Sequence, residues 1–209
     1  FNHAFSNAPV CSVARSTLAT GILAPRVGIQ YHRKTAPAKL PSGVKPWSAI
    51  LRDNGYFCTN IRKTDYNFVS NIKRLWDKPG PAKKPWSGRK SNDMPFFHMQ
   101  SFKQSHEGSL HFPKRLLQTP TTVKPDAVQL APYHPDTPIF RYTHARYFDR
   151  MHAVDQQIGL VLDQLRADGL LEDTFIFYFG DHGGVLPADA HRAHKCCCGS
   201  RQESLNCHA

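Results

Sequence analysis

One long amphipathic segment constrains the fold of this chain more than any other feature. From residue 137 to residue 169, apolar side chains recur every three or four positions, which is the spacing of one helix face: Tyr147, Met151, Val154, Ile158, Val161, Leu162 and Leu165. Thr137 followed by Pro138 predicts the start of this helix, and Gly169 predicts its end. Such a helix must bury its apolar face against another layer of structure.

A short aromatic and β-branched segment, residues 174–179, follows the helix and predicts a buried strand. Helix, short turn and buried strand in this order predict an α/β architecture. Asp181 and His182 come directly after the strand, where α/β folds place their ligands. Hard oxygen ligands with a neighbouring histidine suit a divalent cation, although an Asp-His pair before two glycines is also common in tight turns.

The rest of the chain predicts shorter elements and one boundary. Residues 11–21 predict a turn that opens into a short helix, with Ser12 as its expected N-cap and Gly21 as its end. The other expected elements are a helix over 46–54, a strand over 56–60, a surface loop over 70–94 and a buried strand over 95–102. Periodicity is lost after residue 187, so we expect 188–209 to be a disordered or aberrant tail.

Charge divides the chain into two unequal parts. The net charge is +11, but residues 26–124 hold 19 lysines and arginines against 5 acids, and the remainder is slightly acidic. A basic half of this kind indicates a polyanionic partner, such as nucleic acid, an acidic polysaccharide or a membrane surface, or else a solvated basic face. No apolar run approaches the roughly 20 residues that cross a bilayer, so we expect no membrane span.

The second candidate site lies near the first residues of the chain. Cys11 is expected at a helix start, and Arg15 follows it by one turn. A helix N-terminus favours a thiolate and nearby anions, and an arginine adds a fixed positive charge. This pairing suits a nucleophile that attacks an anionic ester. The alternative is that Cys11 is one of the many cysteines that simply pack in a core.

Several motifs agree in order and spacing with those of one family. Residues 11–21, CSVARSTLATG, contain the Cys, the Arg and the closing Thr-Gly of the signature C-x-P-S-R…T-G, with Val13 in the proline position. Residues 51–56 with Lys63 resemble the segment G-Y-x-T…G-K, and residues 143–183 resemble a long helix and a strand ending in S-D-H-G. By these motifs the chain resembles the sulfatase family of the alkaline-phosphatase-like superfamily. Residues 59–68 and 105–107 look most like the heparan N-sulfatase-like bacterial members.

The resemblance implies a fold and a domain organisation. The expected fold is an alkaline-phosphatase-like sandwich, in which helices enclose a central mixed, largely parallel sheet that is incomplete at its N-terminal side. Residues 1–187 would form a partial sulfatase catalytic domain. The paired aspartates that the family supplies from its first strand are not among these residues, so we expect an excerpt that is inactive by itself.

The resemblance also implies the chemistry. In a sulfuric ester hydrolase of this family, Cys11 would be oxidised co-translationally to formylglycine, whose hydrate is the nucleophile, and Arg15 would hold that hydrate. Lys63 would bind the sulfate, and His106 would protonate the leaving alcohol or amine. Asp181, His182 and the converted Cys11 would bind one Ca²⁺ ion.

The implied partners are a sulfated carbohydrate or aryl sulfate substrate and a formylglycine-generating enzyme, with no nucleic acid. The implied location is periplasmic, secreted or lysosomal. Two alternatives remain open at this point. One is a phosphodiesterase or phosphonate hydrolase of the same superfamily, and the other is a non-catalytic polyanion-binding remnant.

Overall fold

The computed structural model of the 209-residue chain describes residues 6–33, 36–78 and 83–183. They fall into two compact units, one formed by residues up to 101 together with the segment that begins at Phe175, and one formed by residues 102–174. The expected boundary between 1–187 and 188–209 lies outside the described residues and stays a prediction. Among the helices of the described ranges, none combines the length and the hydrophobicity that crossing a membrane requires.

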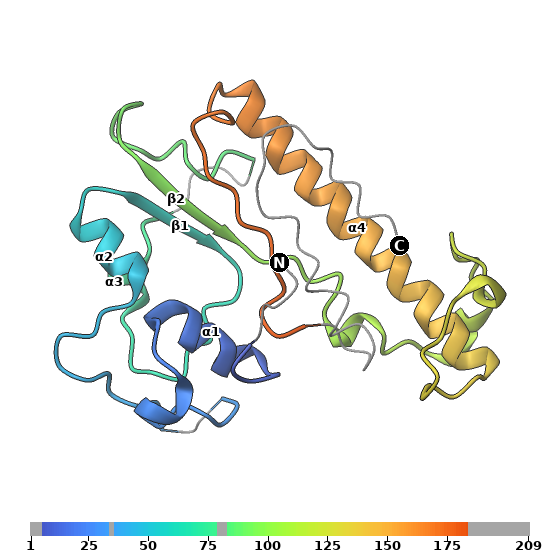
Figure 1. Cartoon of the computed structure of the whole chain (residues 1–209). Coiled ribbons are helices and arrows are strands. Elements are labelled where there is room, and N and C mark those ends of the chain that lie inside the picture. Colours follow the sequence, from blue (N-terminus) through green and yellow to red (C-terminus); the bar gives the residue numbers. More distant parts are fainter. Residues whose placement is uncertain (1–5, 34–35, 79–82, 184–209) are drawn as a thin grey trace. The chain divides into compact units, whose positions relative to one another are not determined.

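The first unit is built around two parallel strands. Its elements are α1 (Cys11–Thr20), the short 3-10 helix η1 (Ala24–Val27), α2 (Trp47–Asp53), β1 (Phe57–Ile61), α3 (Ile72–Leu75) and β2 (Phe96–Gln100). β1 and β2 run side by side in parallel, with Phe57 opposite Phe96 and Ile61 opposite Gln100, and α2 packs against β1 (Figure 1). Helices packed on a parallel strand pair confirm the α/β class.

Aromatic packing stabilises the first unit on the side of α2. Cys58, Leu75 and Trp76 are buried there, and Trp47 and Phe97 pack against them with ring centroids 4.2 Å apart. A second apolar cluster, formed by Val13, Ala24 and Ile29, lies beneath α1. The expected surface loop over 70–94 is therefore only partly a loop, because it forms α3 and buries the apolar side chains of Leu75, Trp76 and Trp86. The strand expected over 95–102 is present, but it is half-buried along its length.

The second unit consists mainly of the long helix. α4 spans Pro138–Ala167, which confirms the segment expected from the sequence, and Thr137 caps it by accepting a hydrogen bond from the Phe140 N–H at 3.3 Å. Gly169 takes the left-handed conformation, with φ of 68°, just past its end. Three short 3-10 helices precede α4 in the chain: η2 (Glu107–Ser109), η3 (Lys114–Gln118) and η4 (Pro125–Ala127). The Tyr142 hydroxyl donates to carbonyl groups in and just after η3, which holds that segment to α4.

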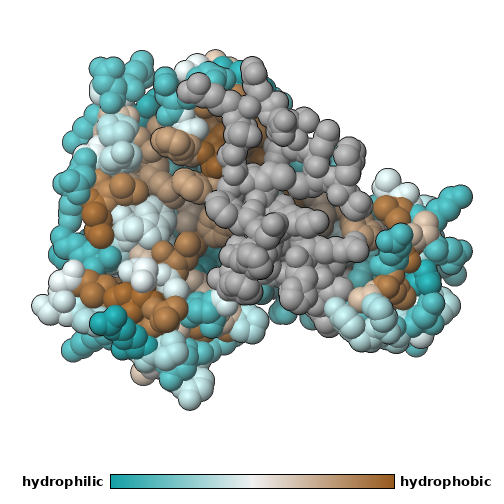
Figure 2. Space-filling view, in the orientation of Figure 1, coloured by the Kyte–Doolittle hydropathy of each residue, from teal (hydrophilic) through white to brown (hydrophobic). Residues whose placement is uncertain are grey.

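Two expectations about the local structure are wrong. The N-cap of α1 is Val10 in an extended conformation, not Ser12, although Gly21 does end the helix with φ of 68°. Residues 174–179 form no strand, because among the described residues no neighbouring strand offers them a hydrogen-bond ladder. Their apolar pattern is that of a strand, yet Phe175 is 94% exposed and Phe177 is 72% exposed. Hydrophobic surface also lies open on the visible face of the molecule (Figure 2).

One buried amide joins three parts of the first unit. The Asn67 side chain donates to the carbonyl oxygens of Ile29 and Tyr31, and the Asn67 N–H donates to the Ser16 hydroxyl on α1. Because Asn67 is only 3% exposed, we expect Asn67→Ala to leave these carbonyls without a donor and to lower the free energy of unfolding by about 1–3 kcal/mol. Denaturant unfolding measures this loss. Asn54→Ala is the matched control, since that exposed side chain makes one local bond to Ile50, and its cost should stay within about 0.5 kcal/mol.

The exposed aromatic segment predicts self-association. Large apolar side chains exposed close together, as Phe175 and Phe177 are, favour association with another chain. We expect the double substitution Phe175→Lys and Phe177→Lys to raise the soluble, monomeric fraction in light scattering and sedimentation. Leu160→Lys on α4 is the control, because Leu160 is a single apolar side chain that is 69% exposed, and it should change little. Equal gains from both changes would contradict a role for this segment.

Candidate active site

The candidate site begins at the first residue of α1. Val10 is extended and Cys11 already belongs to the helix, so the Cys11 thiol lies at the helix N-terminus, where no side chain caps the free N–H groups. Cys11 is a free cysteine and is 9% exposed. The positive end of the helix dipole therefore faces the sulfur, which favours a negative charge at this position.

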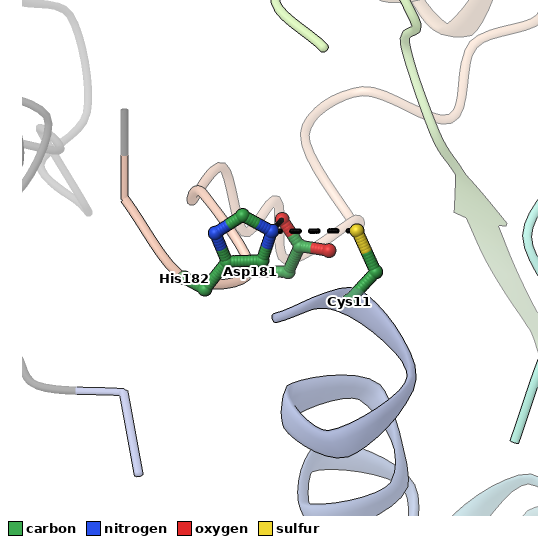
Figure 3. A group of neighbouring side chains, drawn as sticks. All are labelled: Cys11, Asp181 and His182. Carbon is green, nitrogen blue, oxygen red and sulfur yellow. Dashed lines mark hydrogen bonds and ion pairs between the residues drawn. The ribbon is translucent and has the colours of Figure 1, made fainter. Parts of the chain in front are cut away.

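Two residues from the far end of the described chain meet this thiol. His182 Nε2 lies 3.3 Å from Cys11 Sγ, within hydrogen-bond reach for sulfur, although 171 positions separate the two residues. The same nitrogen lies 3.8 Å from Asp181 Oδ1. Figure 3 shows the imidazole and the carboxylate gathered beside the sulfur at the start of α1. One ligand atom from each residue lies within 4.8 Å of the other two, so the three form a compact group of potential metal ligands.

Arg15 connects this group to the sheet. Its Nε lies 2.9 Å from Asp181 Oδ2, and both side chains are largely buried, with 11% and 22% exposed. The Nε–H does not point at the carboxylate well enough for a hydrogen bond, so this contact is an ion pair by distance. A second guanidinium nitrogen donates to the Ser101 hydroxyl at 3.1 Å, and Ser101 is the first residue after β2. The group thus lies at the carboxyl end of a parallel strand, where α/β folds place ligands.

Residues outside the expected set of site residues support α1. The Ser12 hydroxyl lies 3.0 Å from His32 Nδ1 and accepts the Arg33 N–H at 3.0 Å. Arg33 in turn reaches Asp65 at 3.4 Å. Ser12 and His32 lie 20 positions apart in sequence, so no local spacing signal could have found the pair.

Tyr66 adds a neutral polar group near Arg15. Burial raises the pKa of the Tyr66 hydroxyl to about 12, and the Arg15 charge opposes that rise only in part. The ring stacks on Phe68 with centroids 5.1 Å apart. Tyr66 therefore stays protonated near neutral pH and adds no negative charge beside Arg15.

Two of the expected site residues are not joined to this group. Lys63 is half-buried and lies just beyond the end of β1, where Arg62 and Lys63 take left-handed backbone conformations with φ of 70° and 53°. Within the described ranges no hydrogen bond or ion pair connects Lys63 to Cys11, Asp181 or His182. His106 belongs to the second unit, where its Nδ1 accepts the Gly108 N–H at 3.1 Å and caps η2. The roles expected for both residues stay predictions.

The donor atoms decide which cation this group can hold. Calcium takes six to eight oxygen ligands, whereas Cys11, His182 and Asp181 offer one sulfur, one nitrogen and a carboxylate. With Cys11 as a thiol, the described residues do not fit calcium. Replacing the sulfur by an oxygen donor would make the group part of a hard-cation site.

The sulfatase family model matches residues 82–200, which is more than half of the chain. An ulvan-active sulfatase of Formosa agariphila is 31% identical over 227 aligned positions, covering 88% of this chain and 38% of that protein. The human N-sulphoglucosamine sulphohydrolase is 34% identical over 70 positions, covering 34% of this chain and 14% of that enzyme. The chain thus spans well under half the length of the curated relatives that it matches.

A solved structure agrees with the fold. The crystal structure of yidJ from Bacteroides fragilis, a protein assigned to the sulfatases, superposes with a TM-score of 0.52 at 17% identity, covering 82% of this chain and 51% of that one. This likeness confirms the expected alkaline-phosphatase-like fold. From the family match and the motifs around Cys11 and Asp181, the chain belongs to the sulfatase family.

Proposed function

We propose that the protein to which this chain belongs is a sulfuric ester hydrolase that removes sulfate ester or N-sulfate groups from an anionic carbohydrate. One observation supports this most strongly: a cysteine at the start of α1 faces an Asp-His pair from the far end of the described chain. A nucleophile and a cation site placed together at a helix N-terminus suit a substrate that carries a fixed negative charge.

The nucleophile that we propose is the formylglycine made from Cys11. In net terms, the carbon–sulfur bond of the cysteine breaks, a water oxygen becomes the aldehyde oxygen, and sulfur leaves as hydrogen sulfide. Two electrons and two protons pass to an oxidant of the dioxygen class, delivered by a formylglycine-generating enzyme. The hydrated aldehyde supplies a hydroxyl that can attack sulfur and later release sulfate by restoring the carbonyl group.

The side chains around Cys11 take distinct roles in this proposal. Arg15 is held by Asp181 and Ser101, so its charge is positioned beside the reacting atoms before substrate arrives. Lys63 contacts the sulfate oxygens. His106 protonates the oxygen or nitrogen that leaves when its bond to sulfur breaks.

The cation that we propose is Ca²⁺, held in part by Asp181, by His182 and by the oxygen that replaces the Cys11 sulfur. When bound, such an ion stabilises negative charge on the nucleophile and on the sulfate oxygens. Asp181 would serve both the ion and Arg15, because its two carboxylate oxygens point to different partners.

The charge of the chain and the names of its relatives support the substrate class. Residues 26–124 contain most of the excess lysine and arginine, and such a basic half attracts a polyanion. The two curated relatives act, by their names, on ulvan and on N-sulphoglucosamine. Ulvan, heparan sulfate fragments and an aryl sulfate are therefore the first substrates to test, with an aryl phosphate diester for the alternative reaction.

The first test replaces the proposed nucleophile in the complete gene product that carries this sequence. We expect Cys11→Ser to abolish multiple turnover of an aryl sulfate, because a plain serine ester could not expel sulfate by restoring a carbonyl group. Steady-state sulfate release, together with the mass of the peptide that contains residue 11, measures this. Undiminished turnover by Cys11→Ser would contradict the proposed nucleophile.

Cys58→Ala is the matched control for that test. Cys58 is fully buried in β1, and burial raises the pKa of its thiol to about 12, so it is an unreactive cysteine of the same chain. Turnover per folded molecule should be unchanged in this variant.

The same assays distinguish the alternative reaction. A phosphate diester cleaved faster than every sulfate would identify the phosphodiesterase alternative instead.

A second test measures the pair that positions Arg15. We expect a double-mutant cycle of Arg15→Gln and Asp181→Asn to give a coupling free energy of about 1 kcal/mol in denaturant unfolding, because the pair is largely buried. The control cycle uses Lys45 and Asp53, which lie 2.6 Å apart but are 61% and 57% exposed. Solvent screening should hold that coupling to about 0.3 kcal/mol. Equal couplings would mean that burial adds nothing to the Arg15–Asp181 pair.

A further inference from the structure

The three side chains at the candidate site carry three kinds of donor atom. Cys11 offers a soft sulfur, His182 a borderline nitrogen and Asp181 a hard oxygen, and each lies within 4.8 Å of the other two. A set that mixes thiolate, imidazole and carboxylate is typical of zinc and is foreign to calcium.

The distances between these atoms suit one small tetrahedral ion. Zinc lies about 2.3 Å from sulfur and about 2.0–2.1 Å from nitrogen or oxygen, so neighbouring ligand atoms are separated by roughly 3.3–3.7 Å. The Cys11 Sγ–His182 Nε2 distance of 3.3 Å lies in this range, and the His182 Nε2–Asp181 Oδ1 distance of 3.8 Å is slightly longer. The third pair, Cys11 Sγ and the Asp181 carboxylate oxygen, lies within 4.8 Å, and small side-chain movements would bring these two atoms to the separation that zinc requires.

Arg15 holds the Asp181 carboxylate in a position that suits metal binding. Asp181 Oδ2 is 2.9 Å from Arg15 Nε, which leaves Oδ1 on the side of His182. An outer partner that fixes a ligating carboxylate is a regular feature of metal sites. Three protein ligands with one open position for water is the usual composition of an open zinc site.

We propose that the unmodified chain binds a thiophilic divalent cation of the Zn²⁺ type through Cys11, Asp181 and His182, and that conversion of Cys11 ends this preference. On binding, the Cys11 thiol gives its proton to solvent and the metal–sulfur bond replaces the sulfur–hydrogen bond. The second half of the proposal rests on the proposed function, whereas zinc binding by the thiol form does not. A sulfur atom held by zinc is also withheld from oxidation, so zinc would keep the chain in its unmodified form.

The experiment titrates the full chain in its thiol form, confirmed by mass, with Zn²⁺ and Co²⁺. Cys196, Cys197, Cys198 and Cys207 are replaced by serine in this background, so that Cys11 and Cys58 are the remaining thiols. We expect one ion per chain, a cobalt–thiolate charge-transfer band, and no displacement of Zn²⁺ by millimolar Ca²⁺. Calcium competing on equal terms, or a cobalt complex without a thiolate band, would overturn the proposal.

Variants assign the ligands. Cys11→Ser should abolish the charge-transfer band and weaken Zn²⁺ binding by at least about 100-fold, since losing even an outer partner costs 10–100-fold. His182→Gln should weaken binding comparably, and it covers the case in which Cys11→Ser does not fold. Cys58→Ala should bind Zn²⁺ like the parent, because Cys58 lies in the core of β1. Unchanged affinity in both Cys11→Ser and His182→Gln would refute the site.

These outcomes are separate from those of the proposed function. Zinc binding is measured on the thiol form without any substrate, whereas sulfate release is measured on the converted protein. Zinc binding without sulfatase activity would leave the metal proposal standing and refute the enzyme. Sulfatase activity without zinc binding by the thiol form would support the proposed enzyme and refute the metal proposal.

Discussion

The contact between the first turn of α1 and the Asp181-His182 pair is the interaction on which the site depends. It joins residues 171 positions apart, and it brings together a thiol, an imidazole and a carboxylate that are unremarkable when taken singly. Closing so long a loop has an entropic cost that grows only slowly with its length, so a few well-placed contacts can offset it. The largely buried ion pair between Arg15 and Asp181 is one of these contacts.

Arginine is suited to this junction in a way that lysine is not. One guanidinium nitrogen lies beside Asp181 while another donates to Ser101, so a single side chain links α1, the end of β2 and the segment around residue 181. A lysine ammonium is one point charge and lacks this planar fork. Ser12, Ser16 and Asn67 hold the other side of α1 by side-chain hydrogen bonds. The helix start is therefore fixed from two sides before any ligand binds, which is the preorganisation that electrostatic catalysis requires.

The sequence was most informative where the signal is local. The long helix begins and ends within two residues of the expected positions, because Thr-Pro and Gly act on their own neighbours. Ser12 is not the N-cap because the helix already begins at Cys11, and its hydroxyl instead contacts His32 and Arg33, partners that no local pattern reveals. The segment 174–179 has the composition of a strand, yet a strand forms only where another strand pairs with it. The meeting of Cys11 with His182 was found from ordered motifs of a family, and spacing alone would not have found it.

Two buried cysteines of the first unit show why burial alone does not define a reactive thiol. Cys58 lies in β1 among Leu75 and Trp76, and burial raises its pKa to about 12, so it packs as a small apolar residue. Cys11 is nearly as buried, but it lies at a helix N-terminus and faces the imidazole of His182. Its polar neighbours can hold a charge or an ion beside the sulfur, and those of Cys58 cannot. The two thiols therefore differ in what faces the sulfur, and at residue 11 that environment is built by residues from both ends of the described sequence.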